Sequence, residues 1–231
     1  MKILVLVTII YSLTIGYSDV ITITALDVRG GGVFGHGANV SGVTINGNAP
    51  GGTITSDTLD VAMTYSNLNL DGDGSANDAV TFTLRFSGPA NMRAWGQGVD
   101  TGFGTLNGVT ASVLGVSGTT TDLGHAIKFD GFTGGAIGVG GNGDLNRSVE
   151  INGTPLSVVS ASTGAFQFKI ATIDFTPVST VTFDNSGGYS GTISARHHDL
   201  QFSSVIPEPA AIGMILLTSS VGLIVRRRII M

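Results

Sequence analysis

The sequence predicts an all-β fold, and three observations lead to that prediction. Short runs rich in Val, Ile, Thr and Phe recur along the chain, and clusters of Gly, Asn, Asp and Pro separate them. Only 12% of the residues are charged, whereas helix-rich proteins draw heavily on Glu, Lys and Leu. The 35 glycines supply many positions for tight turns. We therefore expect residues 19–204 to form one Gly-rich antiparallel β-sandwich with jelly-roll-like connections.

The apolar runs predict strands at residues 20–28, 40–45, 58–65, 79–86, 109–115, 126–129, 148–151, 155–159, 165–175, 180–184 and 191–195. The clearest run lies between Val80 and Phe86, where every second residue is apolar, so one face of this strand should be buried. The run that begins at Phe166 alternates in the same way but changes phase at Ala171, which predicts a bulge or an edge crossing near that residue.

Glycine occurs in two kinds of segment, in turn dipeptides and in one Gly-rich run. The dipeptides Asn46-Gly47, Asp130-Gly131 and Asn152-Gly153 predict turns, because Asn, Asp and Gly tolerate positive φ. The Gly-rich segment 134–143 lacks the helix and the Lys-Ser/Thr pair that follow a phosphate-binding loop. We interpret this segment as a flexible or bulged connector.

Residues 1–18 have the three parts of a secretory signal peptide. Lys2 gives a positive start, and residues 3–15 are apolar apart from a few hydroxyl side chains. Gly16 and Ser18 place small residues at positions −3 and −1 of a cleavage site. The mature chain should therefore begin at Asp19, and the protein should be exported.

Residues 205–231 have the features of a membrane-directed tail. Pro207 and Pro209 prevent a regular helix before residue 210. Residues 210–225 carry no charge and would span about 24 Å as a helix, slightly less than the hydrocarbon core. The arginines at 226–228 can extend the effective length and should hold that end in the cytoplasm, which leaves the preceding domain outside.

The order of these elements resembles the PEP-CTERM sorting signal of exopolysaccharide-producing Gram-negative bacteria. In that family a Pro-Glu-Pro motif precedes a transmembrane helix and a basic cluster, matched here by Pro207, Glu208, Pro209, residues 210–225, Arg226, Arg227 and Arg228. The resemblance covers only about a tenth of the chain. It implies that an exosortase, a membrane cysteine protease-transpeptidase, recognises the tail and removes the helix.

The resemblance also implies a route for the exported protein. An inner-membrane intermediate, held by the C-terminal helix, would be released to the cell envelope or the extracellular space. It implies no shared activity in the upstream domain, because members of the family differ there. The residues after the arginines, Ile229-Ile230-Met231, depart from many members, which stop or continue with polar residues.

The charge and the cysteine count exclude several classes of function. Residues 19–208 contain seven Lys and Arg against sixteen Asp and Glu, a net charge of −9. This charge disfavours nucleic acid and anionic lipid as partners. Cysteine is absent, so disulfides, thiolate metal sites and a cysteine nucleophile are all excluded.

One acidic segment predicts a structural calcium site. Asp71, Asp73 and Ser75 occupy alternate positions of a Gly-containing segment that Asp78 closes, and alternate oxygen ligands are how calcium loops surround their ion. The segment resembles the Asp-x-Asp-x-Ser calcium loops of extracellular bacterial proteins. The twelfth position, a bidentate Glu in an EF-hand, is Phe82, so we predict a simpler calcium-stapled loop. The alternative is an acidic, solvated turn.

Taken alone, these patterns predict an exported, non-enzymatic envelope or matrix protein. An alternative is a carbohydrate-binding module in an exopolysaccharide matrix, in which Trp95 would stack on a sugar ring; the same Trp would equally suit a core position. A hydrolase on the same scaffold is a further alternative. It would require acidic residues that converge in a cleft and have raised pKa values.

Overall fold

A computed structural model describes residues 18–27, 32–35, 40–49, 51, 54–95, 98–100, 108–142, 147–158, 166–185 and 192–205. The predicted signal peptide, apart from its last residue, and the predicted tail beyond residue 205 lie outside these described residues. Within them, every regular element is a β-strand, which confirms the all-β prediction.

The strands are β1 (Ser18–Asp27), β2 (Gly32–Gly35), β3 (Val40–Ile45), β4 (Ile54–Leu68), β5 (Asp78–Trp95), β6 (Gly98–Asp100), β7 (Val109–Ser117), β8 (Ala126–Asn142), β9 (Arg147–Ile151), β10 (Thr154–Val158), β11 (Phe166–Val178), β12 (Thr180–Asp184) and β13 (Thr192–Val205).

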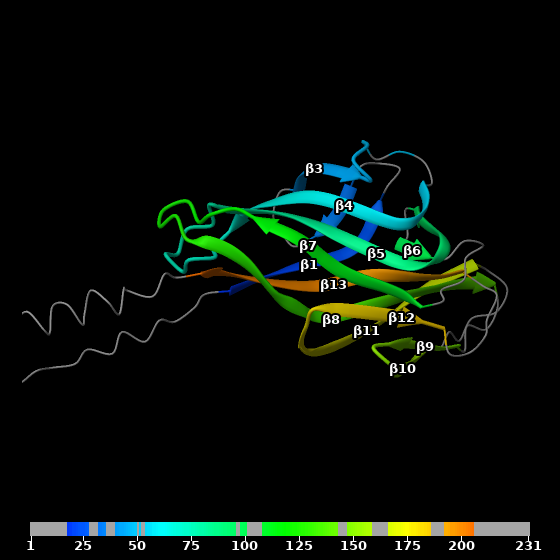
Figure 1. Cartoon of the computed structure of the whole chain (residues 1–231). Helices are drawn as coiled ribbons and strands as arrows, with labels where there is room; N and C mark the ends of the chain where they lie inside the picture. Colours follow the sequence, from blue (N-terminus) through cyan, green and yellow to red (C-terminus); the bar gives the residue numbers. More distant parts are fainter. Residues whose placement is uncertain are drawn as a thin grey trace, which may run out of the picture.

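The strands form a sandwich-like pair of antiparallel layers (Figure 1). Pairing in one layer follows the order β3-β4-β5-β7-β12-β9-β10. Pairing in the other follows β2-β1-β13-β8-β11. The short strand β6 pairs with both β5 and β13, so it links the two layers.

Eight of these strands pair in a nested pattern. The first strand, β1, pairs with the last, β13; inside this pair β7 pairs with β12, β8 with β11 and β9 with β10. The pairs alternate between the two layers, so the chain crosses the sandwich as it moves from the outer pairs to the inner ones. The strands β2, β3, β4 and β5 extend this arrangement at its edges.

Apolar side chains from both layers meet in one core. The face predicted for the run from Val80 to Phe86 is buried as expected, since its four apolar side chains are at most 1% exposed. Phe82 on β5 packs against Phe202 on β13, with ring centroids 5.0 Å apart, so this contact joins the layers. Burial raises the pKa of Tyr65, whose hydroxyl lies in this core without a hydrogen-bond partner.

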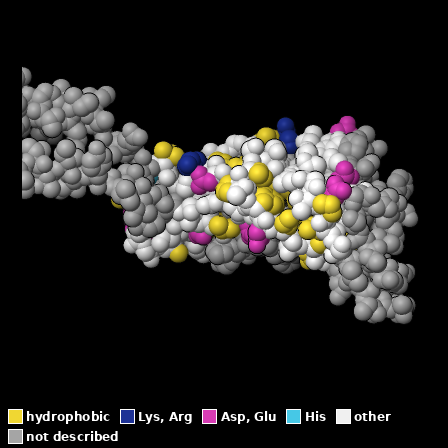
Figure 2. All heavy atoms as spheres, turned by 90° about the horizontal axis from the view of Figure 1, so that it is seen from below, with side chains coloured by type: hydrophobic (Ala, Val, Ile, Leu, Met, Phe, Trp, Pro, Cys, Tyr) yellow, Lys and Arg dark blue, Asp and Glu magenta, His cyan; other side chains and the backbone are white. Residues whose placement is uncertain are grey.

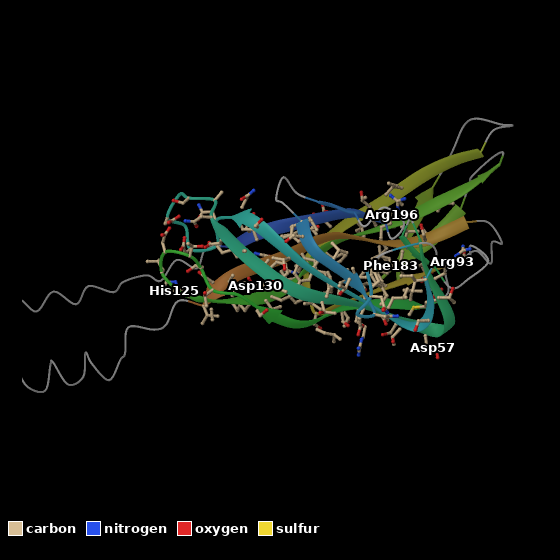
Figure 3. All side chains as sticks on the ribbon, turned by 90° about the horizontal axis from the view of Figure 1, so that it is seen from above. Asp57, Arg93, His125, Asp130, Phe183 and Arg196 are labelled. Atoms are coloured by element: carbon tan, nitrogen blue, oxygen red, sulfur yellow. The ribbon has the colours of Figure 1, made fainter. Side chains whose placement is uncertain are left out.

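Both ends of the described chain lie at one end of the sandwich. Ser18 of β1 is in register with Ser203 of β13, and Val205 is in register with Ala126 at the start of β8. We call this end the terminal pole, and the opposite end, where β5 finishes at Trp95, the distal pole. Figure 3 shows His125 at the terminal pole and Arg93 at the distal pole.

The sequence located most strands but underestimated their length. The predictions for 40–45 and 180–184 match β3 and β12, whereas the strand predicted at 126–129 is the first quarter of the 17-residue β8. The short strands β2 and β6 were not predicted, because runs of four and three residues show no periodicity. Asn46-Gly47 and Asn152-Gly153 adopt positive φ, as expected of turn residues.

The bulge predicted at Ala171 is wrong. The register between β11 and β8 is continuous from Phe166 to Asp174, and it shifts only between Asp174 and Val178. Ala171 is partly buried, whereas Ile170 is 49% exposed on the other face. The apolar pattern therefore changes phase because an apolar residue faces outward, and the strand itself keeps its alternation.

The Gly-rich segment 134–143 is not a connector, because residues 134–142 belong to β8, between β11 and β13. A Cβ added at Gly135 would lie 3.1 Å from Cγ2 of Ile151 on β9, in the opposite layer. Glycine therefore lets the two layers approach closely here. A glycine run is compatible with a buried strand when the facing layer supplies the bulky side chains.

The turn predicted at Asp130-Gly131 is also wrong. Both residues lie inside β8, where the register against β13 shifts between Gln201 and Phe202, as at a bulge. Gly131 has a φ of 149°, and an added Cβ would lie 2.8 Å from Cβ of Pro177 on β11. Backbone conformation and close packing therefore both require glycine at this position.

We predict that Gly131→Ala destabilises the domain by about 2 to 4 kcal/mol, because it combines backbone strain with overpacking. Gly115→Ala is the matched control. Gly115 also lies on a strand with positive φ, but nothing lies within 4 Å of its added Cβ, so only about 1 kcal/mol should be lost. Urea unfolding followed by circular dichroism measures both values, and equal losses would contradict the packing argument.

Candidate functional site

The predicted calcium ligands lie in and beside the loop between β4 and β5, at the terminal pole. Asp73 and Ser75 are exposed, Asp71 is only 6% exposed, and Asp78 is the fully buried first residue of β5. The loop therefore contains two kinds of carboxylate. Their hydrogen bonds show which of them could bind a ligand.

Asp78 has a structural role. One carboxylate oxygen accepts a hydrogen bond from the backbone N–H of Leu70 at 2.7 Å, and the other accepts one from the backbone N–H of Thr121 at 2.8 Å. The first bond closes the β4–β5 loop, and the second joins it to the loop between β7 and β8. Because each oxygen accepts a backbone N–H, Asp78 connects the two loops.

The carboxylates of Asp71 and Asp73 shape the middle of the loop. Oδ1 of Asp71 accepts the backbone N–H of Asp73 at 3.2 Å, and Oδ1 of Asp73 accepts the backbone N–H of Ser75 at 2.6 Å. These are Asx turns, which bend a chain without regular secondary structure. Oδ2 of Asp71 is buried and has no hydrogen-bond partner.

A third carboxylate reaches the loop from a distant part of the sequence. Asp122, in the β7–β8 loop, accepts a hydrogen bond from the side-chain amide of Asn77 at 2.7 Å. The hydroxyl of Thr121 donates to the backbone oxygen of Asn77 at 2.9 Å. These two bonds place Asp122 beside the loop that contains Asp73.

Sequence reasoning missed Asp122 because it lies 45 residues beyond Asn77. One signal could have found it. The runs predicted at 79–86 and 109–115 are strands that pair, as β5 and β7, so the loops that precede β5 and follow β7 lie at the same pole. An acidic residue in each loop would then have indicated a shared site.

The pKa values of two carboxyl groups, Asp73 and Asp60, are lowered. The backbone N–H of Ser75, and next the hydrogen bond with Asp122, hold the pKa of Asp73 below its usual value. The bidentate hydrogen bond with Arg85, at 2.6 Å to each oxygen, does the same for the pKa of Asp60. A general acid at neutral pH needs the opposite shift, so neither of these two groups has that property.

Surface charge on the face shown in Figure 2 is mixed. Acidic side chains are spread among hydrophobic and uncharged ones, and few Lys and Arg side chains are visible there. This distribution fits the acidic composition of the residues between 19 and 208. The structure shows no set of three or more His, Cys, Asp or Glu side chains preassembled around a metal position within its described ranges.

Of the other predicted site residues, the structure describes only the backbone of Trp95. Trp95 is the last residue of β5, and its backbone pairs with Gly98 at the distal pole, but its side chain is outside the described part. Pro207, Glu208, Pro209 and the three arginines at 226–228 also lie outside the described residues. Over the described ranges, no helix is long and apolar enough to cross a membrane.

Comparison with protein-family models, with curated proteins and with solved structures finds no match for this chain. Interpretation of the site therefore depends on its own geometry.

We predict that Asp78→Ala destabilises the domain by about 3 kcal/mol or more, because two backbone N–H groups lose a charged acceptor. Asp78→Asn should cost about half as much, since its amide oxygen can still accept one of the two bonds. Asp174→Ala, at an exposed position of β11, is the control and should change stability by less than about 0.5 kcal/mol. Thermal unfolding in EDTA measures all three, and an Asp78→Ala variant as stable as the control would refute the connector role.

Proposed function

We propose that this chain is an exported, non-enzymatic protein of the cell envelope or extracellular matrix, sorted through its C-terminal Pro-Glu-Pro signal. In this proposal residues 1–18 are removed as a signal peptide. The folded sandwich is then held at the inner membrane by a helix over residues 210–225 until an exosortase releases it.

One observation supports this proposal most directly: the first and last strands are antiparallel neighbours whose outer ends meet. Asp19, the first residue of the proposed mature chain, pairs with Phe202, so the chain enters and leaves the sandwich at the terminal pole. An apolar segment that precedes residue 18 and one that follows residue 205 would therefore both reach a membrane from the same side. The distal pole, with the end of β5, would then face away from the bilayer.

The short distance in sequence between the sandwich and the tail has a further consequence. Val205, the last residue of β13, is two positions from Pro207. Prolines favour an extended backbone, which a protease can bind. They also separate a folded strand from a following helix. The Pro-Glu-Pro motif would thus lie between the sandwich and the bilayer, within reach of an enzyme in the membrane.

The nested strand pairing supports a finer assignment of the fold. A jelly roll forms when one long antiparallel hairpin is wound into two layers, so that its outer and inner strand pairs alternate between them. The pairs β1-β13, β7-β12, β8-β11 and β9-β10 follow this order, and we include a jelly roll in the proposal. The fold alone does not indicate a function, because proteins with jelly-roll folds have many different functions.

We predict that a variant in which Pro207, Glu208 and Pro209 are all replaced by Ala inserts in the membrane but is not trimmed. Insertion depends on the hydrophobic segment, whereas trimming would depend on the motif. Glu150→Ala changes the other glutamate of the chain and should be trimmed like the wild type. Immunoblots of membrane and released fractions, in cells with and without an exosortase, measure the outcome. Trimming that persists without the motif or without the exosortase would reduce the segment to a simple tail anchor.

A second candidate function is carbohydrate binding in an exopolysaccharide matrix. Its support is the position of Trp95 at the distal pole, the end that would face the matrix. Aromatic residues at the end of a sandwich can stack on sugar rings.

Fluorescence tests this second candidate, because Trp95 is the single Trp of the chain. If Trp95 contacts sugar, a soluble bacterial exopolysaccharide should shift or quench its emission, and Trp95→Ala should abolish retention on a column of that polysaccharide. Trp95→Phe should retain part of the binding, because the ring can still stack. Emission unchanged across a panel of acidic and neutral exopolysaccharides would reject this candidate and leave the sorting proposal unaffected.

A further inference from the structure

We propose that Asp71, Asp73 and Asp122 together bind one divalent cation, with Ca²⁺ as the preferred ion, and that this ion joins the β4–β5 loop to the β7–β8 loop. The proposal is independent of the sorting signal. It also differs from the ligand set that the sequence predicts, because it includes Asp122 and leaves out Ser75 and Asp78.

The first observation is a buried carboxylate oxygen with no partner. Asp71 is 6% exposed, and its Oδ1 accepts the backbone N–H of Asp73, which turns the carboxyl group toward that residue. Its Oδ2 is buried and accepts no hydrogen bond. Leaving a buried polar group without a partner is costly, and more so for a charged one. A cation next to Oδ2 would remove this cost.

The second observation is that hydrogen bonds hold the acidic residues of the two loops close together. Thr121, next to Asp122, donates its backbone N–H to Asp78 at 2.8 Å and its hydroxyl to the backbone oxygen of Asn77 at 2.9 Å. Ionised carboxylates are acceptors only and repel one another, so a cation between them would stabilise this arrangement. The amide of Asn77 donates to Oδ2 of Asp122, which fixes that carboxyl beside the loop that contains Asp73.

Third, the two loops contain no Lys or Arg that could balance this charge. Residues 69–77 and 118–125 include three acidic residues, and His125 is their one basic side chain. Lys128, just beyond the second loop, lies 2.8 Å from Asp130 and forms an ion pair with it. An external cation is therefore the available source of positive charge.

The hydrogen bonds also explain why the predicted ligand set changes. Asp78 uses both oxygens to accept backbone N–H groups. Ser75 donates its backbone N–H to Asp73, so it positions a ligand. Oxygen-only donors, including carboxylates, carbonyls and water, are what Ca²⁺ prefers, and six to eight of them surround it.

The affinity should be low. Because the described residues contain no set of three such side chains arranged around a metal position, the carboxylates would have to rearrange as the ion binds. Extracellular modules with few charged ligands bind Ca²⁺ with a Kd on the order of 10⁻⁴ to 10⁻³ M. We expect this range, and weaker binding of Mg²⁺, which requires a smaller and more regular octahedral shell.

Calorimetric titration of the purified full chain in detergent, stripped with EDTA and titrated with CaCl₂, tests the proposal. We expect one site, and Asp73→Asn and Asp122→Asn should each weaken binding by roughly tenfold or more. Asp174→Asn removes one exposed charge on β11 and should bind like the wild type. The proposal is overturned if no Ca²⁺ binds, or if Asp122→Asn binds as tightly as the Asp174→Asn control.

A second measurement separates a ligand from a merely structural residue. In EDTA, Asp71→Asn should melt at the same temperature as the wild type or higher, because it removes an uncompensated buried charge. At 10 mM CaCl₂ the order should reverse, since the wild type gains stability from the bound ion and the variant gains less. Asp78→Asn should be destabilised equally in both conditions. If Asp71→Asn shows the same difference from the wild type with and without Ca²⁺, Asp71 is not a ligand of the ion and the proposal fails.

Discussion

The fold depends most on the pairing of β13 between β1 and β8. This strand is the last of the described chain, yet it hydrogen-bonds to the first strand and to one from the middle of the sequence. The pairing fixes both ends of the chain at the terminal pole and sets the register of β8, which in turn carries β11. Contacts so distant in sequence are slow to form, because loop closure costs entropy before the contacts contribute. We therefore expect the five-strand layer to be completed late in folding.

The two layers pack through two kinds of contact: large side chains meet each other at some positions, and a large side chain meets a glycine at others. Phe82 and Phe202 meet across the layers, whereas at Gly135 the absence of a side chain lets Ile151 approach the backbone of β8. Such complementarity explains why a chain with many glycines and few charges still forms a close-packed core. It also explains why some glycines, such as Gly131, are required while Gly115 stands in open space.

The candidate cation site follows from this architecture. Strands β5 and β7 pair, and so bring the β4–β5 and β7–β8 loops together at the terminal pole. Asp78 connects the loops through backbone hydrogen bonds to both of its oxygens, whereas Asp71 keeps a buried oxygen without a partner. A sandwich without disulfides has few other means of fixing two long loops, and a bound ion would serve that purpose. The same pole is where the chain enters and leaves the domain.

By itself, the sequence determined the fold class, the position of most strands and the buried face between Val80 and Phe86, because alternation and turn residues are local signals. It also located the acidic loop around Asp71, whereas the tail motif at Pro207 lies outside the described residues and stays a prediction. Only the tertiary structure decided which strands pair, that the Gly-rich segment is a buried strand, and that Asp122 joins the acidic loop while Asp78 supports the backbone. These features depend on partners far away in the sequence. Hydrogen-bond satisfaction and close packing are properties of the assembled layers, and no local pattern carries them.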